Sequence, residues 1–243
     1  MLLLKDQIVI PHIFHIIMFI KYLFLEYYGS IIGENGYNYE ALKSKNVENL
    51  PEFYMNLKDL KIGIVPKSID GHFKKKVQYF NNSVGYASKE NGNNLIVKEQ
   101  CLESPSWDIY VMQGNDNVKY NKIKEYLIHQ KCEYIPYIGK NEHFATITSV
   151  KVYNAEPILE GNNIKIDSIF TDNTYLKSNN LLDFDFLFEN KEKPFVFKEV
   201  LPTKLDSKLG YTGFKEFTYT NQNLNIDNPS EVYKIEEKNI FLF

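Results

Sequence analysis

Lysines and aromatic side chains alternate along one polar segment of the chain, residues 68–94. Residues 57–98 hold eight lysines against three acids, although the whole chain has a net charge of −3. Lysines attract phosphates and aromatic rings stack on unpaired bases, so this combination favours binding of single-stranded nucleic acid. The candidate contacts are Lys74, Lys75, Lys76, Tyr79, Asn81, Asn82, Tyr86 and Lys89. The competing interpretation is a solvated loop whose lysines serve solubility.

A turn further along the chain carries a second group of candidate residues. Pro136 ends a short apolar run there and Gly139 turns the chain, and glycine also lets a backbone approach a ligand closely. The side chains around the turn offer hydrogen-bond donors and one potential general base. The candidate residues are Tyr137, Gly139, Lys140, Asn141 and His143. The competing interpretation is that the histidine is an ordinary strand residue.

Composition limits the chemistry that these groups can perform. The chain contains no arginine, so all 28 basic residues are lysines, and any phosphate contact uses a point charge instead of a bidentate guanidinium. Its two cysteines, Cys101 and Cys132, are too few for a disulfide framework or a four-cysteine zinc site. They are typical of small buried hydrophobes in a reducing cytosol. We therefore expect a cytoplasmic protein without a metal or cofactor.

The hydrophobic pattern of the 243 residues predicts the elements that position these side chains. Strands are expected at 60–65, 95–97, 107–111, 133–138 and 145–152, and a helix at 119–130. Their alternation favours an α+β fold with helices on one face of a sheet. Residues 68–94 are expected to form a long loop or a loosely paired hairpin. After Asn154, short apolar runs between polar turns predict a mostly β C-terminal part.

A strongly apolar stretch, Ile8 to Ile32, requires a separate explanation. Proline, histidine, lysine and glutamate interrupt it, so no uncharged run is long enough for a membrane span. It also lacks the pattern of a secretory signal. A buried helix is the favoured interpretation and a membrane-associated segment the alternative. We expect no stable membrane association.

Four segments together resemble a known family. They are Leu57–Ile64, Tyr79–Ala87, Leu95–Leu102 with Pro105, and Tyr134–Asn141. In these segments the chain resembles the fifth CRISPR-associated protein family, of the RAMP superfamily, in the subtype found in type I-B Cascade complexes. The resemblance implies an RRM-like (ferredoxin-like) domain over residues 29–153, a β-rich C-terminal extension over 154–243 and an atypical apolar segment over 1–28.

The resemblance also implies a function in antiviral defence. A member of this family holds the 5′ handle of the CRISPR RNA without cleaving it, caps the filament of backbone subunits and lies beside the large subunit. The alternative is a metal-independent endoribonuclease that processes precursor CRISPR RNA, with His143, Tyr137 and Lys140 at one phosphate. Residues 1–28 match neither the first strand nor the polar loop of the family. A divergent start that leaves the sheet without its first strand is therefore a third interpretation of the apolar stretch.

Overall fold

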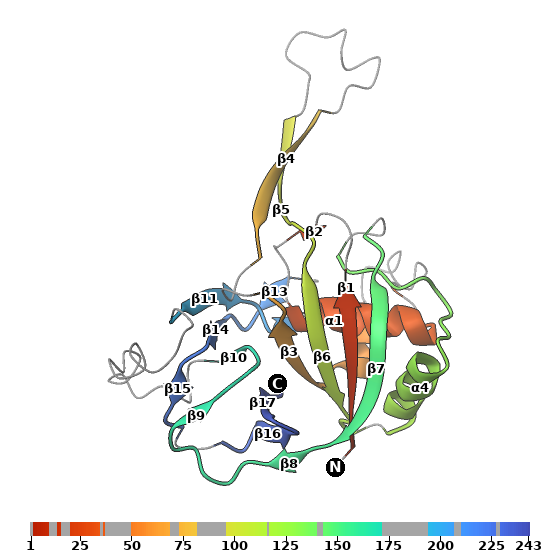
Figure 1. Cartoon of the computed structure of the whole chain (residues 1–243). Helices are drawn as coiled ribbons and strands as arrows, with labels where there is room; N and C mark the ends of the chain where they lie inside the picture. The colour runs from red at the N-terminus through yellow and green to blue at the C-terminus, as the bar shows by residue number, and fades with distance from the viewer. Residues whose placement is uncertain are drawn as a thin grey trace, which may run out of the picture.

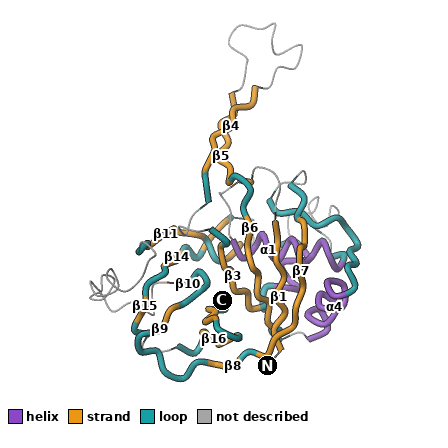
Figure 2. The backbone as a smooth tube through the Cα atoms, in the orientation of Figure 1, coloured by secondary structure: helices purple, strands orange, loops and turns teal. Residues whose placement is uncertain are grey.

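The computed structural model describes most of the chain. The described residues are 2–9, 14–15, 20–34, 36, 50–68, 73–81, 96–115, 117–139, 143–171, 194–206, 210–226 and 229–243. Their helices are few and their strands many (Figures 1 and 2).

A four-stranded sheet forms the centre of the molecule. Its strands are β1 (Leu2–Val9), β3 (Lys61–Pro66), β6 (Ser106–Met112) and β7 (Thr146–Asn154). They lie in the order β3-β6-β1-β7, and all neighbours are antiparallel. Helix α1 (Ile20–Ile32) follows β1, and α4 (Asn117–Ile128) connects β6 to β7. This βαββαβ order is that of a ferredoxin-like domain, so the predicted fold class is confirmed.

The central strands are apolar on both faces because both faces are covered. On β1, Leu4 packs in the core that contains α1 and α4, whereas Leu3 packs in a separate core with C-terminal residues. On β6, Ile109 packs in the first of these cores and Tyr110 in the second. Successive side chains of a strand point to opposite faces, so the helices cover one face and the C-terminal extension covers the other.

The C-terminal extension consists of short strands. They are β8 (Glu156–Pro157), β9 (Ile164–Lys165), β10 (Phe170–Thr171), β11 (Val196–Leu201), β12 (Lys204–Leu205), β13 (Tyr211–Thr212), β14 (Lys215–Thr220), β15 (Asn223–Leu224), β16 (Val232–Ile235) and β17 (Lys238–Phe241). A Cβ on Gly63 of β3 would lie 2.5 Å from Cγ2 of Ile240. Glycine at this position therefore lets the extension pack closely on the sheet.

Residues 1–28 differ from the expectation for an atypical start. β1 lies between β6 and β7 at the centre of the sheet, so the prediction of a missing first strand is wrong. The sequence did not predict this strand because the polar Lys5 interrupts its apolar pattern. In the fold, Nζ of Lys5 lies 3.0 Å from Oδ2 of Asp108 on β6, which satisfies its charge. The division of the chain at residue 28 stays a prediction about domains.

The buried helix predicted within the apolar stretch is confirmed for α1. Most of its side chains are buried, including Leu23, Phe24, Tyr27 and Tyr28, as expected of a helix that is apolar on all sides. α3 (Glu52–Leu57) packs beside it, with the rings of Phe53 and Tyr22 5.1 Å apart. Within the described part of the chain, no helix has the length and apolarity needed to cross a membrane.

Two local expectations are wrong. Residues 133–138 form no strand. Instead, the N–H groups of Glu133 and Tyr134 donate to carbonyls at the end of α1, and Tyr137 forms a single bridge with Phe144. Cys101 is buried as expected, but Cys132 is exposed because it lies in the connection after α4.

The polar segment between β3 and β6 contains a β-hairpin. Strand β4 (Lys75–Asn81) pairs antiparallel with β5 (Ile96–Leu102), and β2 (Phe14–His15) pairs with the base of β5. The hairpin projects from the body of the molecule (Figure 1). Of the two expectations for this segment, paired strands hold for 75–81, while residues 69–72 and 82–95 lie outside the described residues.

Candidate nucleic-acid interface

The pairing of β4 with β5 divides the hairpin side chains between two faces. Tyr79 lies opposite Lys98, and Lys75 and Val77 share its face because side chains alternate along a strand. Lys76 lies on the opposite face, across from Cys101. We call the first of these the Tyr79 face; its described side chains are Lys75, Val77, Tyr79, Ile96, Lys98 and, at the base, Leu102.

The Tyr79 face exposes an aromatic ring next to positive charge. Tyr79 is 62% exposed, and Nζ of Lys98 lies 5.6 Å from the centre of its ring. Val77 and Ile96 on the same face are also exposed. Apolar side chains gathered on a projecting surface mark a binding site more often than isolated ones do. An exposed ring beside ammonium groups is the arrangement that holds unpaired bases and their phosphates.

The three consecutive lysines at the base of the hairpin do not act as one group. Lys74 pairs with Glu103, with Nζ 3.2 Å from Oε2. Lys75 lies over the ring of Phe197 on β11, 5.8 Å from its centre. Lys76 is exposed on the opposite face of the hairpin. Of the three, only Lys75 shares a face with Tyr79.

Aromatic packing holds the base of the hairpin against the body. Phe73, just before β4, contacts Trp107 on β6 edge to face, with ring centres 5.3 Å apart. Trp107 in turn contacts Phe24 of α1 at 6.1 Å. The exposed Tyr79 face therefore rises from a base that is packed into the helix-side core.

The second candidate group is anchored on α1. The hydroxyl of Tyr137 donates to Oε1 of Glu26 at 3.0 Å. Burial raises the pKa of Glu26, and burial together with the charge of Glu26 raises the pKa of Tyr137 to about 12. Gly139 has a φ of +83°, which favours glycine. The N–H of Ile138 donates to the carbonyl of His143 at 3.1 Å and closes the turn.

The hairpin and the turn lie at the same end of the sheet. Val9, at the end of β1, pairs with Ser106 on one side and Thr146 on the other. β6 starts at Ser106, four residues after β5 ends, and β7 starts at Thr146, three residues after His143. Because the two candidate groups flank one strand end, a single extended ligand could contact both.

Several predicted site residues have no described side chain. Asn81 is described in its backbone alone, and Asn82, Tyr86, Lys89, Lys140 and Asn141 lie outside the described residues. Sequence analysis left Val77 and Ile96 out of the site. The alternation of Lys75, Val77 and Tyr79 indicates one face of a strand, but only the register with β5 adds Ile96 and Lys98 to it.

Several solved structures are similar to this chain, including the two that follow. No family model and no curated protein matches the sequence. A CRISPR protein from Archaeoglobus fulgidus, known from a crystal structure, is 10% identical with a TM-score of 0.49; the match covers 99% of this chain and 98% of that one. A chain of a CRISPR RNA-guided surveillance complex is 11% identical with a TM-score of 0.45, and the match covers 93% and 92%.

Proposed function

We propose that this chain is a non-catalytic subunit of a type I CRISPR Cascade complex. In this role it binds the 5′ handle of the CRISPR RNA, caps the filament of backbone subunits and lies beside the large subunit in the cytoplasm. The proposal joins the family resemblance of four sequence segments to the surface that two of them form. Of those two segments, Leu95–Leu102 contains the whole of β5, and Tyr79–Ala87 contributes the last three residues of β4.

The Tyr79 face is the observation that carries the proposal. It combines an exposed tyrosine, a lysine near its ring and Lys75 at the base of a projecting hairpin. Stacking accepts any base, and lysine point charges suit phosphates without reading a sequence. A single-stranded RNA end held mainly by its backbone and base faces fits this chemistry.

The direct test is RNA binding as a function of salt. The probe is a single-stranded RNA with the repeat-derived 5′ end, compared with a shuffled RNA of equal length. If about four lysines neutralise phosphates, the logarithm of the affinity should fall with the logarithm of the salt concentration with a slope of about −3. A slope indistinguishable from zero would show that the protein has no electrostatic RNA site.

A triple substitution tests the location of that site. Changing Lys74, Lys75 and Lys76 to alanine should weaken binding without unfolding the domain, because exposed lysines contribute little to stability. Changing three exposed lysines elsewhere, Lys131, Lys215 and Lys234, removes the same charge and serves as the control. Equal losses in both variants would mean that net charge matters and the hairpin does not.

The non-catalytic part of the proposal has its own test. Metal-free cleavage would require Tyr137 to act with His143 on RNA, but its hydroxyl donates to Glu26. Purified protein incubated with precursor repeat RNA in EDTA should leave the RNA intact. Cleavage that disappears in a His143→Ala variant would replace this proposal with the nuclease.

Co-expression with backbone subunits should give filaments with one copy of this chain at one end.

A further inference from the structure

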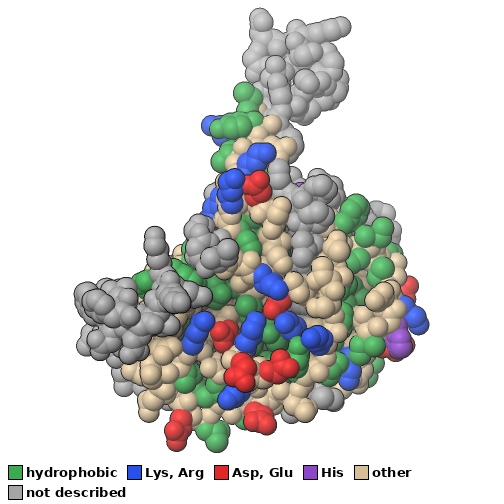
Figure 3. All heavy atoms as spheres, in the orientation of Figure 1, with side chains coloured by type: hydrophobic (Ala, Val, Ile, Leu, Met, Phe, Trp, Pro, Cys, Tyr) green, Lys and Arg blue, Asp and Glu red, His purple; other side chains and the backbone are tan. Residues whose placement is uncertain are grey.

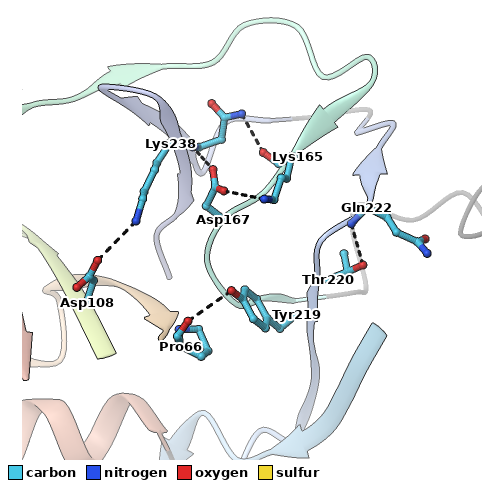
Figure 4. Close-up of polar contacts among 9 residues, drawn as sticks. Pro66, Asp108, Lys165, Asp167, Tyr219, Thr220, Gln222 and Lys238 are labelled. Carbon is cyan, nitrogen blue, oxygen red and sulfur yellow. Dashed lines mark hydrogen bonds and ion pairs between the residues drawn. The ribbon is translucent and has the colours of Figure 1, made fainter. Parts of the chain in front are cut away.

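Three lysines from separate parts of the chain meet at one buried carboxylate. Asp108 on β6 is 3% exposed, and its Oδ2 lies 3.0 Å from Nζ of Lys5 on β1 and 3.5 Å from Nζ of Lys238 on β17. Nζ of Lys67, just after β3, lies 3.7 Å from Oδ1. Figure 4 shows the contact with Lys238. We call Lys5, Lys67 and Lys238 the lysine cluster.

Strand pairing explains why these residues meet. Asp108 lies opposite Gln7 on β1 and opposite Val65 on β3. Lys5 and Lys67 are each two residues from those positions, which makes them diagonal neighbours within reach of a long side chain. Lys238 arrives from the extension that covers this face. The cluster is therefore fixed by the sheet on two sides and by the extension on the third.

The three lysines of the cluster share one ion-pair partner. Among the described residues, Asp108 is the one acid in ion-pair contact with them. Asp167 lies nearby, but its Oδ1 pairs with Lys165 and its Oδ2 accepts from the N–H of Asn239 (Figure 4). Glu236 is a further acid on this side, where its charge acts on Tyr110. In direct contact, three ammonium groups meet one carboxylate, an arrangement that attracts an anion to the lysines.

Two lysines of the cluster are partly exposed to solvent, whereas the carboxylate of Asp108 is buried. The side chains of Lys67 and Lys238 are 41% and 42% exposed, against 3% for Asp108. An approaching anion thus meets the lysines before it meets the acid. Each ammonium group has three donors, so a lysine that contacts Asp108 keeps donors for a second acceptor.

The lysine cluster lies at the foot of the hairpin. The N–H of Lys67 donates to the carbonyl of Ser106 at 2.9 Å, and the adjacent Trp107 packs on Phe73 at the base of β4. Figure 3 shows lysine side chains on the hairpin and again over the middle of the same face, where acidic side chains lie among them. Lys75 of the Tyr79 face lies over Phe197 of β11, so this face points toward the extension that supplies Lys238.

We propose that the lysine cluster binds a phosphate group and that Asp108 is the positioning residue that gathers the three lysines. This inference rests on the proposed function for the source of the phosphate, which is the backbone of an RNA that also contacts the hairpin. Free inorganic phosphate has the same chemistry, and the experiment distinguishes the two.

The first measurement is RNA affinity for the Lys67→Gln/Lys238→Gln double variant. Loss of two phosphate contacts should make the salt slope less negative by about 1.4 and weaken binding about 25-fold at roughly 0.1 M salt. The matched control is Lys131→Gln/Lys234→Gln, which removes two exposed lysines elsewhere and should change affinity less than about twofold. Lys67→Arg/Lys238→Arg keeps the charge and should retain binding, which separates loss of charge from loss of folding.

The second measurement is the melting temperature in phosphate against chloride at equal ionic strength, without RNA. If phosphate stabilises the wild type but not the glutamine variant while both bind RNA equally, the cluster binds phosphate from the free pool. If the glutamine variant changes neither measurement, the inference is overturned. A wild type that binds no RNA would refute the proposed function, and the phosphate measurement would still decide the inference.

Discussion

Two lysine–tyrosine pairs in this molecule have the same geometry and opposite surroundings. Lys98 lies 5.6 Å from the ring centre of Tyr79 on the hairpin, and Lys5 lies 5.6 Å from that of Tyr110 on the central sheet. Tyr79 is 62% exposed, whereas Tyr110 is 2% exposed. The same pair of residue types is therefore exposed on a projecting hairpin in one place and packed in the core in the other.

The C-terminal extension makes the difference. Tyr110 packs in a core with Tyr233, Ile240 and Leu242 of the extension, and Lys5 pairs with Asp108. RRM domains stack RNA bases on aromatic side chains of their sheet, and the extension covers that face in this chain. We infer that the hairpin provides the exposed aromatic surface that the covered sheet cannot.

The largest effect is expected from a substitution of Tyr110, the buried tyrosine of the two pairs. Tyr110→Ala should lower the free energy of unfolding by about 3–5 kcal/mol, because it removes a fully packed aromatic ring. Urea denaturation measures this loss. RNA affinity per folded molecule should stay unchanged. A variant that keeps its stability and loses RNA binding would mean that the ring of Tyr110, although the extension covers it, contacts RNA.

A third lysine extends the comparison to a site where burial outweighs the attraction of the nearby acids. Lys21, at the start of α1, forms no ion pair among the described residues, and burial lowers its pKa to about 8, partly opposed by Asp59. Between pH 8 and 10.5 the unfolded chain keeps this proton while the folded chain loses it. Stability should therefore rise with pH over that range, by up to about 3 kcal/mol.

The Lys21→Met variant provides the measurement. It should be more stable than the wild type at pH 7, and the difference between the two should shrink from pH 8 to 10.5. Taking the difference removes the contribution of other lysines and tyrosines that titrate there. A constant difference across this range would show that Lys21 keeps an ordinary pKa in the folded state.

Sequence patterns identified the fold better than they identified the site. The alternating strand and helix signals of 60–65, 107–111 and 119–130 correspond to β3, β6 and α4, because local apolar periodicity determines these elements. β1 was missed because Lys5 is satisfied by Asp108, a residue about a hundred positions away. Pairing over such a separation leaves no local signal.

The candidate site shows the same limit. Lysine and aromatic content drew attention to the hairpin, but the sequence could not separate Lys75 from Lys76, which lie on opposite faces. It also placed Tyr137 among the possible RNA contacts without indicating that its hydroxyl donates to Glu26 on α1. The RNA contact of Tyr137 stays a prediction. Register and tertiary contacts, not residue type, decide which side chains a ligand can reach.

The exposed tyrosine gives the next prediction. Tyr79→Ala should weaken binding of the repeat-derived RNA by about 1–3 kcal/mol if its ring stacks on a base. Its unfolding free energy should change by less than about 0.5 kcal/mol, as usual for a surface residue. Tyr134→Ala removes another exposed tyrosine, outside the hairpin, and is the control. Equal RNA affinities of the two variants would show that the ring of Tyr79 does not stack on a base.

The smallest expected effect separates charge from packing at Lys98. Lys98→Met keeps an apolar stem beside the ring of Tyr79 and removes the ammonium group that lies over it. If that group neutralises one phosphate, the salt slope should become less negative by about 0.7 and affinity should fall about fivefold at roughly 0.1 M salt. Folding stability should be unaffected, because the lysine is exposed. A loss of affinity with an unchanged slope would mean that Lys98 orients the tyrosine ring and makes no phosphate contact. The contrast between the Lys98–Tyr79 and Lys5–Tyr110 pairs would then be one of exposure alone.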